Sequence, residues 1–153
     1  MFVLIEMVKS KSNISKLLEA KTDVYIAHLL KIYFYRTHPS FEYWISEISS
    51  FITSIPLLKG IKRLPSHKFI VEHTYGWISE NIEGIANCFI MDNLDENNPD
   101  AYGKECLDYN KHNFKQFIES YFDEFANRIL KNKGYISRTQ VSEIVNRLLN
   151  KYE

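Results

Sequence analysis

The chain has 153 residues with ten Phe, ten Tyr and two Trp, and its nineteen acidic residues equal its nineteen basic ones. This length suits one domain spanning residues 1–153, and the ordinary hydrophobic content argues against disorder. Zero net charge disfavours nonspecific binding to nucleic acid, and no segment reaches the roughly 20 continuous apolar residues of a membrane-spanning helix.

The amino terminus, MFVLIEMVKSK, is apolar but does not resemble a signal peptide. No basic region precedes the apolar part, Glu6 interrupts it, and no small-residue cleavage site follows. Cys88 and Cys106 are too few for a disulfide framework, and both fall at apolar positions, where cysteine acts as a small hydrophobe. We therefore expect a reduced, cytoplasmic protein, with residues 1–8 open to a helix, an edge strand or a dimer contact.

Helical periodicity begins at Ile14 and stops before Pro39, because proline restrains the preceding residue and cannot donate to the helix. This segment is one long helix, or two helices joined at Thr22 and Asp23. Its apolar positions are Ile14, Leu17, Leu18, Tyr25, Leu29 and Ile32.

A second helix is predicted from Phe41 to Ile55, with Ser40 as its cap and Pro56 at its end. The segment LLKGIKRLP that follows is predicted to be a loop. The apolar stripe of the helix is Phe41, Trp44, Ile45, Ile48, Phe51, Ile52 and Ile55.

Ser66 is the expected cap of a third helix, which runs through HKFIVEHTYGWISENIEGIANCFIMDN. Gly76 and Gly84 weaken it by roughly 1 kcal/mol each relative to alanine, and either glycine could mark a kink or a close helix contact. The expected apolar stripe is Phe69, Ile70, His73, Trp77, Ile85 and Phe89.

The polar run from Asp92 to Asp100 is predicted to be an exposed loop, and a long helix follows it from about Ala101 to Gly134. One sector of this helix is apolar, which predicts that it faces the core. Its residues are Cys106, Leu107, Phe114, Phe117, Ile118, Tyr121 and Phe125. The opposite side carries Asp108, His112, Glu119 and Asp123.

The stretch KNKGYISRTQ, residues 131–140, lies between this helix and a last one. Aligned with a calcium-binding EF-hand loop, it places Lys131 and Lys133 where oxygen ligands belong, which excludes calcium. We instead predict a corner in which Gly134 takes the left-handed C′ position, and Ser137 and Gln140 form a capping box.

Charge divides the chain into three blocks. Residues 1–78 hold ten Lys and Arg against six Asp and Glu, residues 79–124 three against eleven, and residues 125–153 six against two. The balances are +4, −8 and +4. An acidic block between basic flanks is either an accident of loop placement or a surface that meets a basic partner.

Motifs of enzymes and of cofactor sites are absent from the sequence. It contains no glycine-rich phosphate loop and no nucleophile elbow, and no nucleophile accompanies His73 and its neighbours Glu72 and Glu80. Asp108, His112 and Glu119 could contact a divalent ion, but an i, i+4 charge pair explains the first two. We therefore expect no catalytic, cofactor-binding or metal-binding residues. An enzyme would instead place His28 or His73 in a buried pocket beside an unsatisfied polar group.

These patterns predict an all-α protein, a single compact bundle of five to six helices. We expect a cytoplasmic protein-binding module, an inhibitor or an immunity or antitoxin type of protein, that steers a basic partner onto an acidic face and buries tyrosines as anchors. The alternative is a helix-turn-helix nucleic-acid-binding protein that uses the last helix pair. The expected partner-binding residues are Asp92, Asp95, Glu96, Asp100, Tyr102, Asp108, Tyr109, Glu119 and Asp123.

Overall fold

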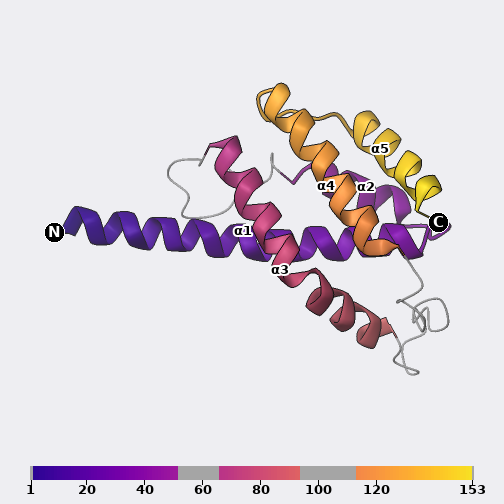
Figure 1. Ribbon diagram of the computed structural model, residues 1–153, viewed down its shortest axis with the longest axis horizontal. Helices are drawn as coiled ribbons and strands as arrows, with labels where there is room; N and C mark the ends of the chain where they lie inside the picture. The colour runs from indigo at the N-terminus through magenta and orange to yellow at the C-terminus, as the bar shows by residue number, and fades with distance from the viewer. Residues whose placement is uncertain (1, 52–65, 94–112, 153) are drawn as a thin grey trace.

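A computed structural model describes residues 2–51, 66–93 and 113–152, with side chains described for 14–51, 66–89 and 113–152. Over these ranges the chain contains no strand, and the all-α prediction is confirmed (Figure 1). The helices are α1 (Phe2–Phe34), α2 (Phe41–Ser49), α3 (His67–Asn93), α4 (Phe114–Lys131) and α5 (Arg138–Lys151).

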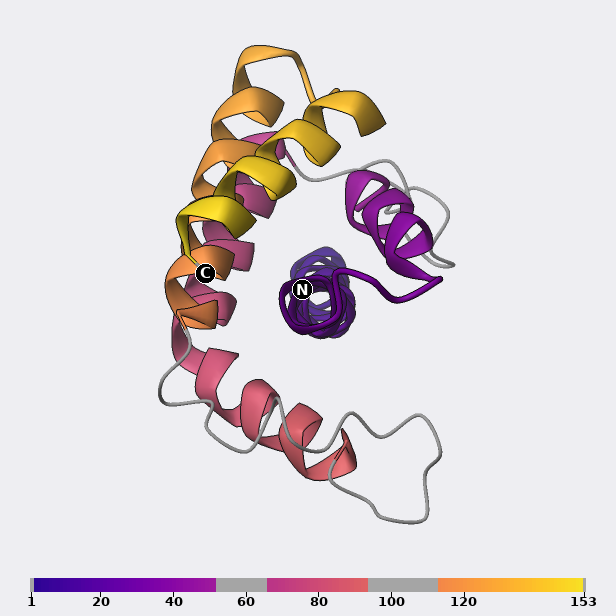
Figure 2. The same ribbon diagram turned by 90° about the vertical axis from the view of Figure 1, so that its right-hand side faces the viewer.

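Helix α1 is the centre of the bundle. Figure 2 looks along it and shows the other helices on an arc around it, and α2, α3 and α4 all contact it. Because α1 has neighbouring helices on several sides, its apolar face must be wider than the single stripe of a surface helix. The buried residues of α1 form such a face: Leu18, Thr22, Tyr25, Ile26, Leu29, Leu30, Ile32 and Tyr33.

The helix is continuous from Phe2, so the start predicted at Ile14 is wrong. Residues 2–8 are helical, and no join forms at Thr22 and Asp23. The Thr22 side chain is buried, and its hydroxyl donates to the carbonyl of Leu18 at 2.6 Å. This bond satisfies the hydroxyl within the helix, so the polar residue does not require a break.

Helix α2 is shorter than predicted, because it ends at Ser49 rather than at Ile55. The hydroxyl of Ser49 donates to the carbonyl of Ser46, three residues back, at 2.7 Å. Such bonds offer the backbone an alternative to the helical ladder. The predicted continuation through Ile52 and Ile55, and the loop after it, lie outside the described residues.

The start of α2 also differs from the prediction. Ser40 is its N-cap residue but its side chain makes no capping bond. Instead, the backbone N–H of Ser40 donates to Nδ1 of His38 at 3.0 Å. The His38 ring stacks on Trp44 with ring centroids 4.9 Å apart, so the turn is fixed by a histidine rather than by the predicted serine cap.

Helix α3 begins as predicted, since the hydroxyl of Ser66 accepts from the N–H of Phe69 at 3.2 Å. Its predicted apolar stripe is partly wrong, because Phe69 is exposed and His73 and Trp77 are half-buried. α3 packs against both α1 and α4, so the face of α3 that is turned toward these two helices is the buried one. The buried residues are Ile70, Thr74, Ile78, Ile82, Ala86 and Phe89.

One further expectation for α3 is corrected, and one of the two alternatives for its glycines is excluded. Cys88 is exposed rather than part of an apolar stripe. Gly76 and Gly84 make no close helix contact, because a Cβ at either position would meet nothing within 4 Å. Cys106 lies outside the described residues.

Helix α4 confirms the prediction for its described part. Phe114, Phe117, Ile118, Tyr121 and Phe125 are all buried. The helix begins at Phe114 with Asn113 as its N-cap residue, so the prediction of one continuous helix from about Ala101 is wrong at this point. The predicted start, with Cys106 and Leu107, lies outside the described residues. The 3.6-residue period was therefore sufficient to identify the core face of this helix.

The corner between α4 and α5 is capped at both ends. The capping box of Ser137 and Gln140 is confirmed, with backbone-to-side-chain bonds of 3.1 and 3.0 Å. The left-handed C′ position belongs to Lys133 (φ 55°) rather than to Gly134, which follows it at φ 90°. The N–H of Gly134 donates to the carbonyl of Ile129 at 2.8 Å, the six-to-one bond of a Schellman motif.

Candidate functional site

A groove lies between α1 and α3. Glu19 of α1 lines one side and residues of α3 line the rest of this open hollow, which has a volume of about 250 Å³. The lining residues of α3 are Glu72, His73, Gly76, Trp77 and Glu80. This is a mixed surface of carboxylates and aromatic rings.

The spacing of residues along α3 produces the groove. Glu72, Gly76 and Glu80 are four residues apart and therefore lie on one face of the helix. The glycine has no side chain, and a Cβ there would point into open space. α3 thus carries a notch between two glutamates.

One hydrogen bond and one longer ionic contact connect the wall of the groove to α1. The indole N–H of Trp77 donates to the carboxylate of Asp23 at 2.6 Å. Nε2 of His73 lies 3.5 Å from the carboxylate of Glu19, and the ring of Phe69 stacks on His73 with centroids 5.7 Å apart. These contacts fix both rings at the edge where the two helices meet.

The groove carries more negative charge than its own cations neutralise. Glu72 lies 3.9 Å from Lys68, but both side chains are exposed, so this pair is weak. Glu19 pairs with His73, which is charged only when protonated. Glu80 forms no ion pair with any residue in the described ranges. Carboxylates beside a tryptophan ring form an environment that attracts cations.

The structure describes only part of the predicted acidic face. Glu119 is half-buried and Asp123 is exposed, both on α4. Asp92 belongs to the last turns of α3, but its side chain is outside the described ranges. The other members lie outside the described residues: Asp95, Glu96, Asp100, Tyr102, Asp108 and Tyr109. Their role in binding stays a prediction.

The partner predicted for His73 is corrected. The sequence suggested Glu72 or Glu80 on the same helix, whereas the structure places Glu19 of α1 beside the ring. Position 73 borders the face of α3 that packs against α1, so its side chain lies beside α1. Of the residues suggested for a metal ion, Asp108 and His112 lie outside the described ranges. Within those ranges no three His, Cys, Asp or Glu side chains converge as ligands.

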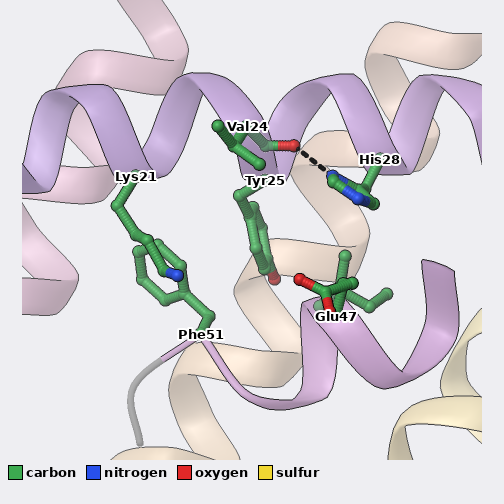
Figure 3. Close-up of a pocket in the computed structure, with 7 residues that line it drawn as sticks. Lys21, Val24, Tyr25, His28, Glu47 and Phe51 are labelled. Atoms are coloured by element: carbon green, nitrogen blue, oxygen red, sulfur yellow. Dashed lines mark hydrogen bonds between the residues drawn. The ribbon is translucent and has the colours of Figure 1, made fainter. Parts of the chain in front are cut away.

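A second, much smaller hollow lies between α1 and α2 and is drawn in Figure 3. It contains His28 beside Tyr25, whose buried hydroxyl interacts with the side chain of Tyr121. Tyr25 is therefore not the unsatisfied polar neighbour expected in an enzyme pocket. The hollow also offers only about 20 Å³ to a water-sized sphere, which is too little for a substrate.

Sequence reasoning missed the groove. The signal along α3 is Glu-x-x-x-Gly-x-x-x-Glu at residues 72–80, which places a gap between two carboxylates on one helical face. Glu19 could not have been assigned to the same site, because it is more than fifty residues away and joins the groove only through packing of α1 on α3.

Comparison of the chain with protein-family models, curated proteins and solved structures finds no match in any of the three. Among the described residues, no helix combines the length and the apolar character that crossing a membrane requires. The geometry and the charge of the groove are therefore the features that bear on function.

Proposed function

We propose that this chain is a small cytoplasmic protein-binding module, of the inhibitor or immunity and antitoxin type, that captures a basic partner through acidic surface. The groove between α1 and α3 is its docking site within the described structure. A Lys or Arg side chain of the partner enters beside Trp77 and is surrounded by Glu19, Glu72 and Glu80.

The observation that carries this proposal is the excess of carboxylates around a hollow of 250 Å³ that a tryptophan lines. Charge of one sign in a concave surface raises the local concentration of the opposite ion and speeds association. The ring of Trp77 offers a cation a favourable face. Glu119 and Asp123 of the predicted acidic face extend the same sign of charge to α4.

The rival nucleic-acid function depends on Arg138 and Arg147 of α5. Nη2 of Arg138 lies 2.6 Å from the carboxylate of Glu42, and Arg147 pairs with Glu124. Both arginines are thus partly neutralised by neighbouring helices. The geometry favours capture of a basic protein over contact with phosphate.

A matched pair of glycine substitutions tests the groove. Gly76→Leu fills the notch between Glu72 and Glu80, whereas Gly84→Leu adds the same side chain to the same helix outside the groove. Both positions have open space, so both variants are expected to gain about 0.5–1 kcal/mol of unfolding free energy from higher helix propensity.

The two variants are expected to differ in binding. Calorimetry with a short peptide of alternating glycine and arginine should show binding about tenfold weaker for Gly76→Leu, one tenfold step being 1.4 kcal/mol, and unchanged for Gly84→Leu. Equal affinity in both variants and the unaltered protein would remove the groove from the proposal.

A further inference from the structure

The wall of the groove between α1 and α3 carries a histidine whose charge depends on pH. Nε2 of His73 lies 3.5 Å from the carboxylate of Glu19, and the two side chains are 27 % and 28 % exposed. Nε2 itself is buried and forms no hydrogen bond with the described residues. The contact between the two side chains is therefore ionic, and its strength depends on whether the ring carries a proton.

The charged groups around His73 come from two helices. Helix α4, the other helix that packs on α3, contributes no residue to the groove. Within the described ranges, Glu19 is the carboxylate that forms an ion pair with the ring. The charged groups that line the groove or border its wall are Glu19 and Asp23 on α1, and Lys68, Glu72 and Glu80 on α3.

Glu19 has two alternative partners of positive charge. When the ring of His73 is neutral, the Glu19 carboxylate is free to pair with a cationic side chain that enters beside Trp77. When the ring gains a proton, both of its nitrogens become donors, and His73 itself pairs with Glu19. The protonated ring also adds a positive charge to the wall, which repels the cation of a partner. Protonation of one residue therefore removes an attraction and adds a repulsion.

We propose that His73 competes with the basic partner for Glu19, so that protonation of His73 releases the partner and loss of the proton restores binding. This inference rests on the proposed function, because it concerns the regulation of the same groove. Binding is strongest above the range in which histidine ordinarily titrates, about pH 5 to 8, and is lost as the pH falls through it. Glutamate ordinarily gains its proton only near about pH 4.3, so release at a higher pH belongs to the histidine.

Calorimetry of the full chain at about pH 8 and about pH 5.5 tests the competition, with a glycine–arginine peptide whose ends are acetylated and amidated so that its own charge stays constant. The unaltered protein should bind roughly fivefold more weakly at the lower pH. His73→Gln keeps a polar side chain without the titration, so its affinity should change by no more than about 1.5-fold. His28→Gln removes a histidine outside the groove and should keep the fivefold change.

A second variant, Glu19→Gln, removes the shared carboxylate and keeps the histidine. Only the repulsion then remains, so the effect of pH should shrink to about twofold. The inference is overturned, and the proposed function stands, if the unaltered protein binds the peptide equally at both pH values. An undiminished effect of pH in both His73→Gln and Glu19→Gln has the same meaning. If the unaltered protein does not bind the peptide at about pH 8, the proposed function fails, and this inference fails with it.

Discussion

Replacing Glu19, Glu72 and Glu80 together by glutamine is expected to weaken binding of a glycine–arginine peptide by roughly 30-fold. A partly exposed pair of a carboxylate and a cation contributes about 0.2–1 kcal/mol. Loss of three such interactions therefore costs about 2 kcal/mol, which corresponds to the stated factor at 25 °C. Glutamine keeps the shape of each side chain, so the hollow itself is preserved. Calorimetry at low and high salt measures the effect, which should shrink as salt screens the charges.

A control of equal charge separates the groove from net charge. The triple variant Glu119→Gln, Asp123→Asn and Glu143→Gln changes the charge by the same amount outside the groove. Affinity should then fall by no more than about twofold to threefold, because none of these three side chains lines the groove. If this control weakens binding as much as the groove variant does, attraction is a property of the whole surface. If the control alone weakens binding, the acidic face on α4 is the docking site.

Phe125→Ala is expected to lower the free energy of unfolding by about 3–5 kcal/mol, the range for removal of a fully buried phenylalanine. Phe125 is completely buried in α4. Its ring centroid lies within 6.5 Å of those of Tyr25, Phe51, Tyr121 and Phe122, which belong to α1, the residues after α2, and α4 itself. The cavity left by alanine therefore removes contacts from three segments at once.

Chemical denaturation measures this loss, and Leu130→Ala provides the control. Leu130 lies on the same helix with 47 % of its surface exposed. Its substitution should change the unfolding free energy by no more than about 0.5 kcal/mol. A loss below about 1 kcal/mol for Phe125→Ala would show that the aromatic cluster does not hold these segments together.

Helical periodicity was sufficient for the parts of the fold that have one buried face. In α4 the spacing of the buried aromatic residues identified the core face: Phe114, Phe117, Tyr121 and Phe125. The capping box of Ser137 and Gln140 could be predicted from the local residue types. In α3 the aromatic stripe through Phe69, His73 and Trp77 suggested the wrong face. The His73 and Trp77 rings lie at the edge of α3 beside α1 rather than in the buried contact of α3 with α1 and α4, and Phe69 is exposed.

The candidate site was less predictable, because it forms only when distant segments pack. Glu72 and Glu80 flank a glycine on one helix, but Glu19 reaches them through the packing of α1 on α3. Charge counts along the chain instead predicted a binding surface within the acidic block, residues 79–124. Charge counting detects blocks along the sequence, whereas this groove combines residues from two blocks.

The chain's two tryptophans provide the most direct test of the groove as a docking site. Trp77 lines the groove, whereas Trp44 of α2 is buried beside His38, so one indole reports on the site and the other serves as an internal control. During titration with the glycine–arginine peptide, the indole N–H resonance of Trp77 should shift in a saturable manner while that of Trp44 stays in place. A Trp77 resonance that does not move while the peptide binds would contradict the proposed docking site.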